Sequence, residues 1–157
     1  MILKFKLMTK KIIIAILIFA ALVYIIKGCL KGDEARIRDM LAESKTWAEK
    51  KDLLHLLTHF DKTFSDDSGL SQEDIKVIAF RVFQQWEKIE VPYQEISLSV
   101  NGDKALLIVD IYLYVTKSSK RRELFEPVRN TNRFEVKLSK REGKWKFMES
   151  KIPSDIN

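Results

Sequence analysis

The hydrophobic pattern divides the chain into three stretches. Residues 12–26 are apolar without interruption. In residues 33–60 and 71–91, apolar side chains recur every three or four positions, which is the spacing of helices with one buried face. From Tyr93 onward, apolar and polar positions alternate, which predicts strands. The chain has 157 residues, so the part after the first stretch has the length of one domain.

The first predicted helix runs from Asp33 to about Phe60. Asp33 can cap its amino end, and Glu34 suits the first turn. The apolar stripe drifts near residues 50–52, so we expect a bend there. The side chains that share the stripe are Ile37, Met40, Leu41, Trp47, Ala48, Leu53, Leu54, Leu57 and Phe60.

The second predicted helix begins at Ser71, after a loop of turn-forming residues from Phe64 to Gly69. Ser71 and Asp74 fit a capping box, in which each side chain accepts a backbone hydrogen bond of the other residue. The helix is expected to end before Pro92. Its apolar stripe consists of Ile75, Ile78, Ala79, Val82, Phe83 and Trp86.

Four strands are predicted in the remainder of the chain. Asn101-Gly102-Asp103 and Arg141-Glu142-Gly143 have the composition of hairpin turns, and Lys117–Pro127 is a polar connection. The strands are Tyr93–Val100 with Ile96, Leu98 and Val100 facing inward, Ala105–Val115, Thr131–Lys140 with Phe134, Val136 and Leu138 inward, and Lys144–Ile152 with Trp145 and Phe147 on one face. The second strand is apolar on both faces and should be central. Helices followed by strands indicate an α+β domain, with helices packed on one face of a curved four-stranded antiparallel sheet.

The amino-terminal stretch predicts a membrane attachment. Residues 1–11 form a basic amino terminus, and residues 12–30 are long enough to cross a bilayer as a slightly short helix. Three interpretations stay open: a single-pass signal anchor, a lipoprotein signal that ends in Gly28-Cys29 with Cys29 as the lipidated residue, and a cleaved secretory signal. All three place residues 33–153 on the same side. Because positive charge stays inside, we expect a bacterial inner-membrane protein whose domain faces the periplasm or the cell exterior.

The net charge of +6 follows from the same stretch, because six lysines flank the apolar run. The domain itself is nearly neutral, which argues against a nucleic-acid partner. One basic run remains in the domain, and we interpret it as a solvated turn and not as a nucleic-acid-binding patch. The chain has one cysteine, Cys29, so it forms no intrachain disulfide. The six flanking lysines are Lys4, Lys6, Lys10, Lys11, Lys27 and Lys31, and the basic run is Lys117, Lys120, Arg121 and Arg122.

The order of these elements resembles the nuclear transport factor two-like superfamily, the cystatin-like α+β cone. The resemblance covers about Glu34 to Pro153. It rests on the long first helix, the Phe64–Leu70 loop before Ser71, the Asn101-Gly102 hairpin, the long central strand and the closing pair Asn132–Leu138 and Gly143–Met148. The resemblance implies a conical pocket between sheet and helices, and a homodimer formed through the sheet. Members include isomerases, cyclases, dehydratases and non-catalytic binding modules, so the fold does not determine the function.

Asp110, Tyr112 and Tyr114 form the sharpest candidate pocket. They share a face of an otherwise apolar strand, where a carboxylate and two phenols could act as base and hydrogen-bond donors. Alternatively, Asp110 faces solvent or a dimer partner, or it pairs with Arg133 or Lys137 of a neighbouring strand. Ketosteroid isomerase uses an Asp and Tyr set in a cone of this kind, but none of its motifs aligns with these residues, so no catalytic residue is assigned.

No metal site or cofactor is predicted. His55 and His59 are four residues apart on a helix but lack a third ligand, so we expect surface histidines. Asp66 and Asp67 do not have calcium-loop spacing, which favours turn formation. The three tryptophans, Trp47, Trp86 and Trp145, are expected in the core.

Two functions are therefore carried forward. The first is a membrane-anchored, non-catalytic binding or assembly module that takes a protein partner or a small apolar ligand. The alternative is a small-molecule isomerase, cyclase or dehydratase that uses the conical pocket. The direction of Asp110, Tyr112 and Tyr114, toward a cavity or away from it, separates them.

Overall fold

The computed structural model describes residues 32–124 and 132–152. By contacts the chain divides into two units, and everything below concerns the second, from Glu34 onward. The predicted membrane segment 12–30, including Cys29, lies outside the described residues. Within the described ranges, no helix is both long and apolar enough to cross a membrane.

Three helices are described: α2 (Asp33–Glu49), α3 (Leu53–Leu57) and α4 (Gln72–Gln85). The bend expected near residues 50–52 is present as a break between α2 and α3. Lys51 takes a φ of 59°, which the right-handed helix cannot accommodate, and Asp52 caps α3 by accepting a hydrogen bond from His55 N. The prediction of helix up to Phe60 is wrong beyond Leu57.

Phe60–Asp66 forms a strand, β1, where the sequence predicts the end of a helix and a loop. β1 lies parallel to β8 (Lys144–Lys151), a segment about eighty residues away in the chain. Phe60 and Phe64 pack edge to face with ring centroids 5.0 Å apart, and Phe64 is buried. This spacing of aromatics fits a helix as well as a strand, and the distant partner strand decides between them.

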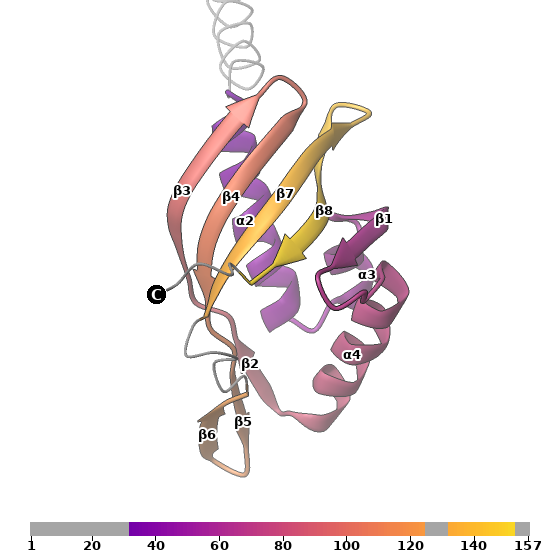
Figure 1. Cartoon of the computed structure of the whole chain (residues 1–157). Helices are drawn as coiled ribbons and strands as arrows, with labels where there is room; N and C mark the ends of the chain where they lie inside the picture. Colours follow the sequence, from indigo (N-terminus) through magenta and orange to yellow (C-terminus); the bar gives the residue numbers. More distant parts are fainter. Residues whose placement is uncertain (1–31, 125–131, 153–157) are drawn as a thin grey trace, which may run out of the picture. The chain divides into compact units, whose positions relative to one another are not determined.

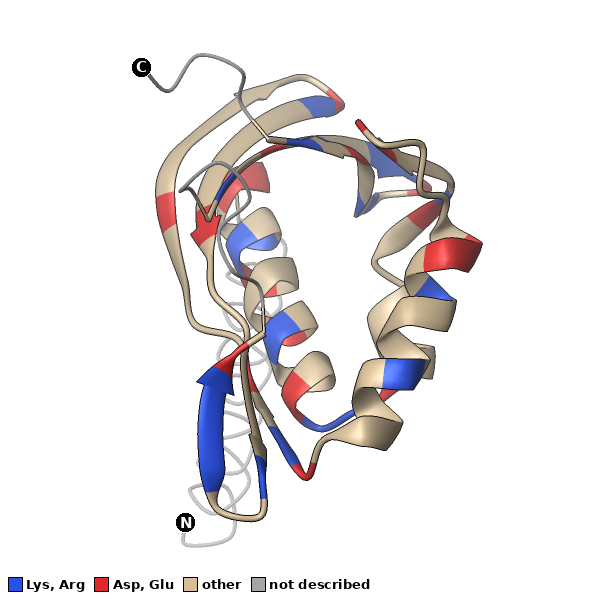
Figure 2. Cartoon of the chain, turned by 60° about the horizontal axis from the view of Figure 1, so that its bottom comes forward, with Lys and Arg blue, Asp and Glu red and all other residues tan. Residues whose placement is uncertain are grey.

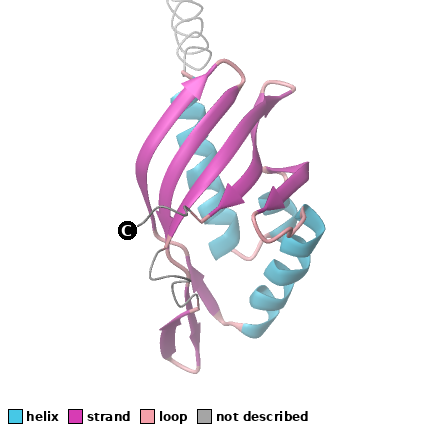
Figure 3. Ribbon diagram, viewed as in Figure 1, coloured by secondary structure: helices cyan, strands magenta, loops and turns pink. Residues whose placement is uncertain are grey.

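The main sheet has the order β1-β8-β7-β4-β3, with β3 (Tyr93–Asn101), β4 (Lys104–Ile111) and β7 (Arg133–Arg141). The four predicted strands form its antiparallel part. With β1 added, the sheet is five-stranded and mixed, which corrects the four-stranded prediction. Figures 1 and 3 show α2 running along one face of this curved sheet, and α4 standing apart from α2 beyond β1. The α+β class is confirmed.

The long central strand predicted for Ala105–Val115 is interrupted. β4 ends at Ile111, and β5 (Tyr114–Lys117) belongs to a second, three-stranded sheet of order β2-β5-β6, with β2 (Lys88–Glu90) and β6 (Lys120–Glu123). The polar connection predicted for Lys117–Pro127 thus contains a strand. Its turn uses Ser118 and Ser119 at φ 50° and 63°, which serine adopts less readily than the asparagine and glycine that signal such turns.

The core lies between α2 and the inner face of the main sheet. The buried helix residues Ile37, Met40 and Leu41 belong to one cluster with the buried sheet residues Leu107, Val109, Val136, Leu138, Trp145 and Phe147. A smaller cluster of Trp86, Ile89 and Val115 joins the end of α4 to the second sheet. Trp86 and Trp145 are therefore core residues, as predicted, whereas Trp47 is half-buried and stacks on His55.

Ile96 is 42% exposed, although the alternation in β3 predicts that it faces inward. The pairing of β3 with β4 shifts register between Glu95 and Ser97, which is a bulge at Ile96. The bulge leaves Tyr93 on the same face as Leu98 and Val100, and all three pack on the core. Glu95 reaches α2, where Arg38 Nε and Nη2 donate to its carboxylate at 2.9–3.2 Å. These bonds raise the pKa of the Arg38 guanidinium.

We predict that Leu107→Ala and Leu106→Ala differ sharply in stability. The two leucines are adjacent on β4, but Leu107 is fully buried against α2 and Leu106 is 38% exposed on the opposite face. Leu107→Ala should lower the free energy of unfolding by about 2–5 kcal/mol, and Leu106→Ala by about 1 kcal/mol or less. Chemical denaturation of the full chain measures both. Equal losses would contradict the assignment of inner and outer faces.

Candidate functional site

A cavity of about 600 Å³ lies on the inner face of the main sheet. Its walls come from α2, β1, α4 and the strands β4, β7 and β8. Figure 2 shows the sheet arching over the two longer helices, which stand apart from each other. The site therefore lies where the resemblance to the cone-like fold implies a pocket.

The lining is dominated by apolar side chains. Of the sixteen lining residues, three are polar, namely Asp66, Asn132 and Ser150. The other thirteen are Leu41, Phe60, Phe64, Leu70, Ile75, Ile78, Leu107, Val109, Ile111, Phe134, Val136, Phe147 and Ile152. Such a surface binds apolar molecules by excluding water, and the few polar groups can orient them.

α4 forms one wall of the cavity without filling it. None of its residues is fully buried, and Ile75 and Ile78 of its predicted core stripe line the cavity. The amino end of α4 is held by the predicted capping box, which is confirmed: Ser71 Oγ accepts from Asp74 N, and Asp74 accepts from Ser71. The bonds that Ser71 donates lower the pKa of the Asp74 carboxyl. The cap thus sets the position at which α4 begins beside the cavity.

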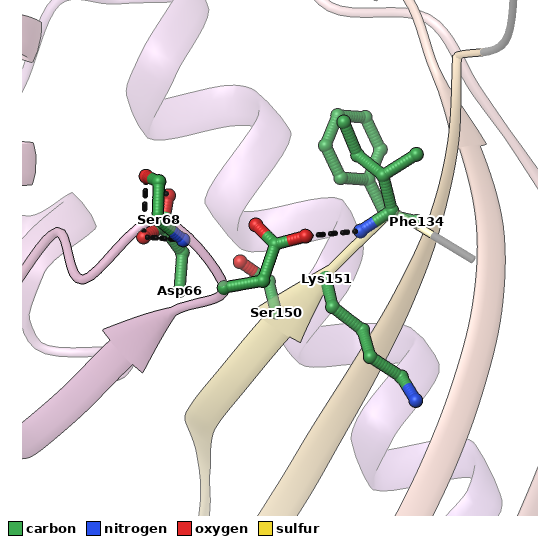
Figure 4. Close-up of a pocket in the computed structure, with 7 residues that line it drawn as sticks. Asp66, Ser68, Phe134, Ser150 and Lys151 are labelled. Carbon is green, nitrogen blue, oxygen red and sulfur yellow. Dashed lines mark hydrogen bonds between the residues drawn. The ribbon is translucent and has the colours of Figure 1, made fainter. Parts of the chain in front are cut away.

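A second hollow of about 420 Å³ lies beside the cavity, and we call it the polar hollow because five of its seven lining residues are polar. The two share Asp66, Phe134, Ser150 and Ile152 among their lining residues, so they are neighbours in the fold. The remaining residues of this polar hollow are Asp67, Ser68 and Lys151. Figure 4 shows Asp66 and Ser68 on one side, Phe134 on the other, and Ser150 between them.

The loop after β1 carries the two carboxylates of the polar hollow. Asp66 Oδ1 accepts from Ser68 N, Ser68 Oγ and Leu70 N at 3.0, 2.8 and 2.7 Å. Asp67 joins this loop to β8: its N–H donates to Ser150 O at 3.0 Å, and its Oδ2 accepts from Ile152 N at 3.2 Å. The turn-forming role predicted for both residues is present, and both also line a hollow.

Asp110 lies on the outer face of the sheet. Leu107, Val109 and Ile111 of the same strand line the cavity, and alternation therefore turns Asp110 away from it. Its carboxylate accepts two bonds from Arg133 of β7, at 2.8 Å from Nε and 3.1 Å from Nη2. This is one of the alternatives that the sequence leaves open. The hydrogen bonds and charge of Asp110 raise the pKa of the Arg133 guanidinium.

Tyr112 and Tyr114 are also absent from the described lining of both hollows. Their rings stack with centroids 6.4 Å apart, and the Arg121 guanidinium lies 3.8 Å from the centroid of the Tyr114 ring. The structure thus brings the two tyrosines together, with Arg121 over the ring of Tyr114. They do not share a strand face with Asp110, because β4 ends between them and Asp110.

The two histidines have separate surroundings. His55 Nδ1 lies 2.7 Å from Asp52 Oδ2 at an exposed site, whereas the His59 side chain is only 13% exposed and its Nε2 lies 3.7 Å from Glu43 Oε2. The prediction of surface histidines is wrong for His59. Burial lowers the pKa of the His59 imidazole, the Glu43 carboxylate opposes this, and Lys146 adds to it. In the described part of the chain, no three side chains of His, Cys, Asp or Glu gather where they could hold a metal ion.

The sequence did not point to the residues that line the cavity. The sequence around Asp66 predicts a turn residue. Asn132 and Ser150 lie in predicted strands, where nothing distinguishes them from the other polar positions. One usable signal is the inward alternation of Phe134, Val136 and Phe147, which predicts a shared face. The resemblance implies a pocket on that face but does not say which residues line it.

No family model matches the chain, and no curated protein is similar to it in sequence. Solved structures do resemble it. A nuclear transport factor two-like protein with a cystatin-like fold from Novosphingobium aromaticivorans has a TM-score of 0.59 at 11% identity, over 88% of this chain and 90% of its own. The domain has the cystatin-like fold. This confirms the fold implied by the sequence resemblance.

Two further solved structures resemble the domain. A conserved protein from Planctomyces limnophilus has a TM-score of 0.65 at 17% identity, over 76% of this chain and 94% of its own. A protein from Novosphingobium aromaticivorans named "Putative Scytalone Dehydratase" has a TM-score of 0.63 at 12% identity, over 76% of this chain and 81% of its own. At such identities the likeness concerns the fold alone.

We predict that His59 makes stability depend on pH. Because burial depresses its folded-state pKa below the unfolded value of ~6.5, the unfolded chain binds the proton more readily. The contribution is fully present above that value and is lost as pH falls toward the folded pKa. The free energy of unfolding of the native chain should therefore fall relative to that of His59→Gln between pH 8 and pH 5. A difference between the two proteins that stays constant over this range would contradict the prediction.

Proposed function

We propose that the protein is a membrane-anchored, non-catalytic binding module whose cavity takes a small apolar ligand. The cavity of about 600 Å³ carries this proposal. Ligand pockets span roughly 300–1,000 Å³, whereas voids inside close-packed proteins are few and small. An apolar hollow of this size lowers stability when empty, and an apolar occupant would recover the lost contacts.

The lining supports binding better than catalysis. As far as the structure describes it, the lining has no histidine, cysteine, tyrosine or lysine. Asp66 is its one carboxylate, and one oxygen of that carboxylate accepts three bonds from its own loop. The alternative, an isomerase, cyclase or dehydratase, draws support from the fold and from the name of one structural neighbour. It would need a base and donors that converge on the ligand.

Membrane attachment through residues 12–30, with the domain in the periplasm or at the cell exterior, belongs to the same proposal and rests on the sequence pattern. A homodimer formed through the outer face of the sheet is also part of this proposal. Exposed Ile96 and Leu106 project from the strands of that sheet, and a protein partner could use the same surface.

We predict saturable binding of 2-naphthalenemethanol, an uncharged apolar probe, to the full chain in nanodiscs of zwitterionic lipid. Val109→Phe fills part of the cavity and should weaken binding about tenfold, which corresponds to ~1.4 kcal/mol. Ile108→Phe, on the outer face of the same strand, is the matched control and should leave affinity unchanged. Calorimetry with empty nanodiscs subtracted measures both. Absence of binding to the folded native chain would refute the proposed function.

We predict that the domain is accessible from outside the cytoplasm. In a Cys29→Ser background, Ser119→Cys places one thiol at the exposed turn between β5 and β6. A membrane-impermeant maleimide should label it in intact spheroplasts. Labelling only after lysis would place the domain in the cytoplasm. Cys29→Ser alone distinguishes a helical anchor from a lipid anchor. With a helical anchor, the variant should have the same size as the native protein and stay in the membrane. With a lipid anchor, the variant should accumulate as an unprocessed precursor that is larger than the native protein.

A further inference from the structure

The polar hollow adds a chemical constraint to the ligand of the cavity. The hollow and the cavity share Asp66, Phe134, Ser150 and Ile152, so a molecule with its apolar body among the phenylalanines can extend a polar end toward Asp66 and Asp67. We infer that the ligand is a small apolar molecule that carries one amine, held as an ammonium beside these carboxylates. This inference rests on the proposed function and names the ligand class of the same site.

The charge of the hollow favours a cation. Among its lining residues, Asp66 and Asp67 contribute two carboxylates and Lys151 one ammonium. Lys151 does not neutralise them: register places it opposite Glu135, on the outer face, and its Nζ lies 3.0 Å from Glu135 Oε1. Figure 4 shows its side chain extending away from Asp66 and Ser68. The hollow therefore presents net negative charge at the end of an apolar cavity.

Acceptor atoms remain for a ligand. A carboxylate can accept about four hydrogen bonds. Asp67 uses Oδ2 for Ile152 N, and its Oδ1 has no partner in the described ranges. Asp66 Oδ1 accepts the bonds of its own loop, whereas Asp66 Oδ2 has only the Ser68 hydroxyl at 2.9 Å, whose single hydrogen it shares with Oδ1. An ammonium has three donors and no acceptor, so it matches these oxygens, whereas a carboxylate ligand would meet like charge.

Three probes with one apolar body test this inference: 2-naphthylmethylamine, 2-naphthalenemethanol and 2-naphthoic acid. Each probe is titrated into the full chain in zwitterionic nanodiscs, and calorimetry at pH 7 measures its affinity. We expect the amine to bind roughly tenfold more tightly than the alcohol, the size of one charge-assisted hydrogen bond. The acid should bind most weakly. This preference for the amine should diminish as salt is raised.

Asp67→Asn is the decisive variant, because an amide oxygen can still accept from Ile152 N while the charge is lost. It should bring the affinities of amine and alcohol close together. Glu149→Gln removes the same charge from the outer face of β8, where Glu149 pairs with Lys137, and should keep the preference. Equal binding of all three probes, or tightest binding of the acid, overturns the amine inference and leaves the cavity proposal standing. No binding of any probe to the folded chain overturns both.

Discussion

The structure depends on the packing of one helix, α2, along part of a curved sheet. Ile37, Met40 and Leu41 bury the inner side chains of β4 and its neighbours, and the Arg38–Glu95 pair joins the same helix to the edge strand. The other long helix, α4, contacts β1 and α3 and contributes no fully buried residue. Because the sheet curves, its inner face extends beyond the reach of α2, and the remaining apolar side chains line a cavity.

Features set by neighbouring residues could be predicted from the sequence. The capping box of Ser71 and Asp74 and the turns at Gly102 and Gly143, with φ of 58° and 75°, are present because each is decided within a few positions. β1 could not be predicted, because its parallel partner β8 is far away in the chain and no local sequence pattern indicates this pairing. The bulge at Ile96 reverses the expected face for a similar reason, since it depends on pairing with β4.

The candidate site was beyond local reasoning for a further reason. Asp110 and the tyrosines stand out in the sequence because they interrupt an apolar strand, yet the strand is apolar on both faces and an interruption does not say which face it marks. The ion pair with Arg133 provides a structural role for Asp110 on the outer side. The cavity is instead lined by ordinary apolar residues of six elements. Such a site is a property of curvature and helix placement, which no single segment encodes.

The loop between β1 and α4 links binding to folding. Asp66 and Asp67 shape this loop through their own hydrogen bonds, fix it to β8 and supply the charge of the polar hollow. The same loop leads into Ser71, whose cap starts the helix that forms one wall of the cavity. A ligand that engages the carboxylates therefore contacts the residues that hold α4 in place. Since α4 has few buried contacts of its own, occupancy of the cavity should stabilise this helix more than the rigid core around α2.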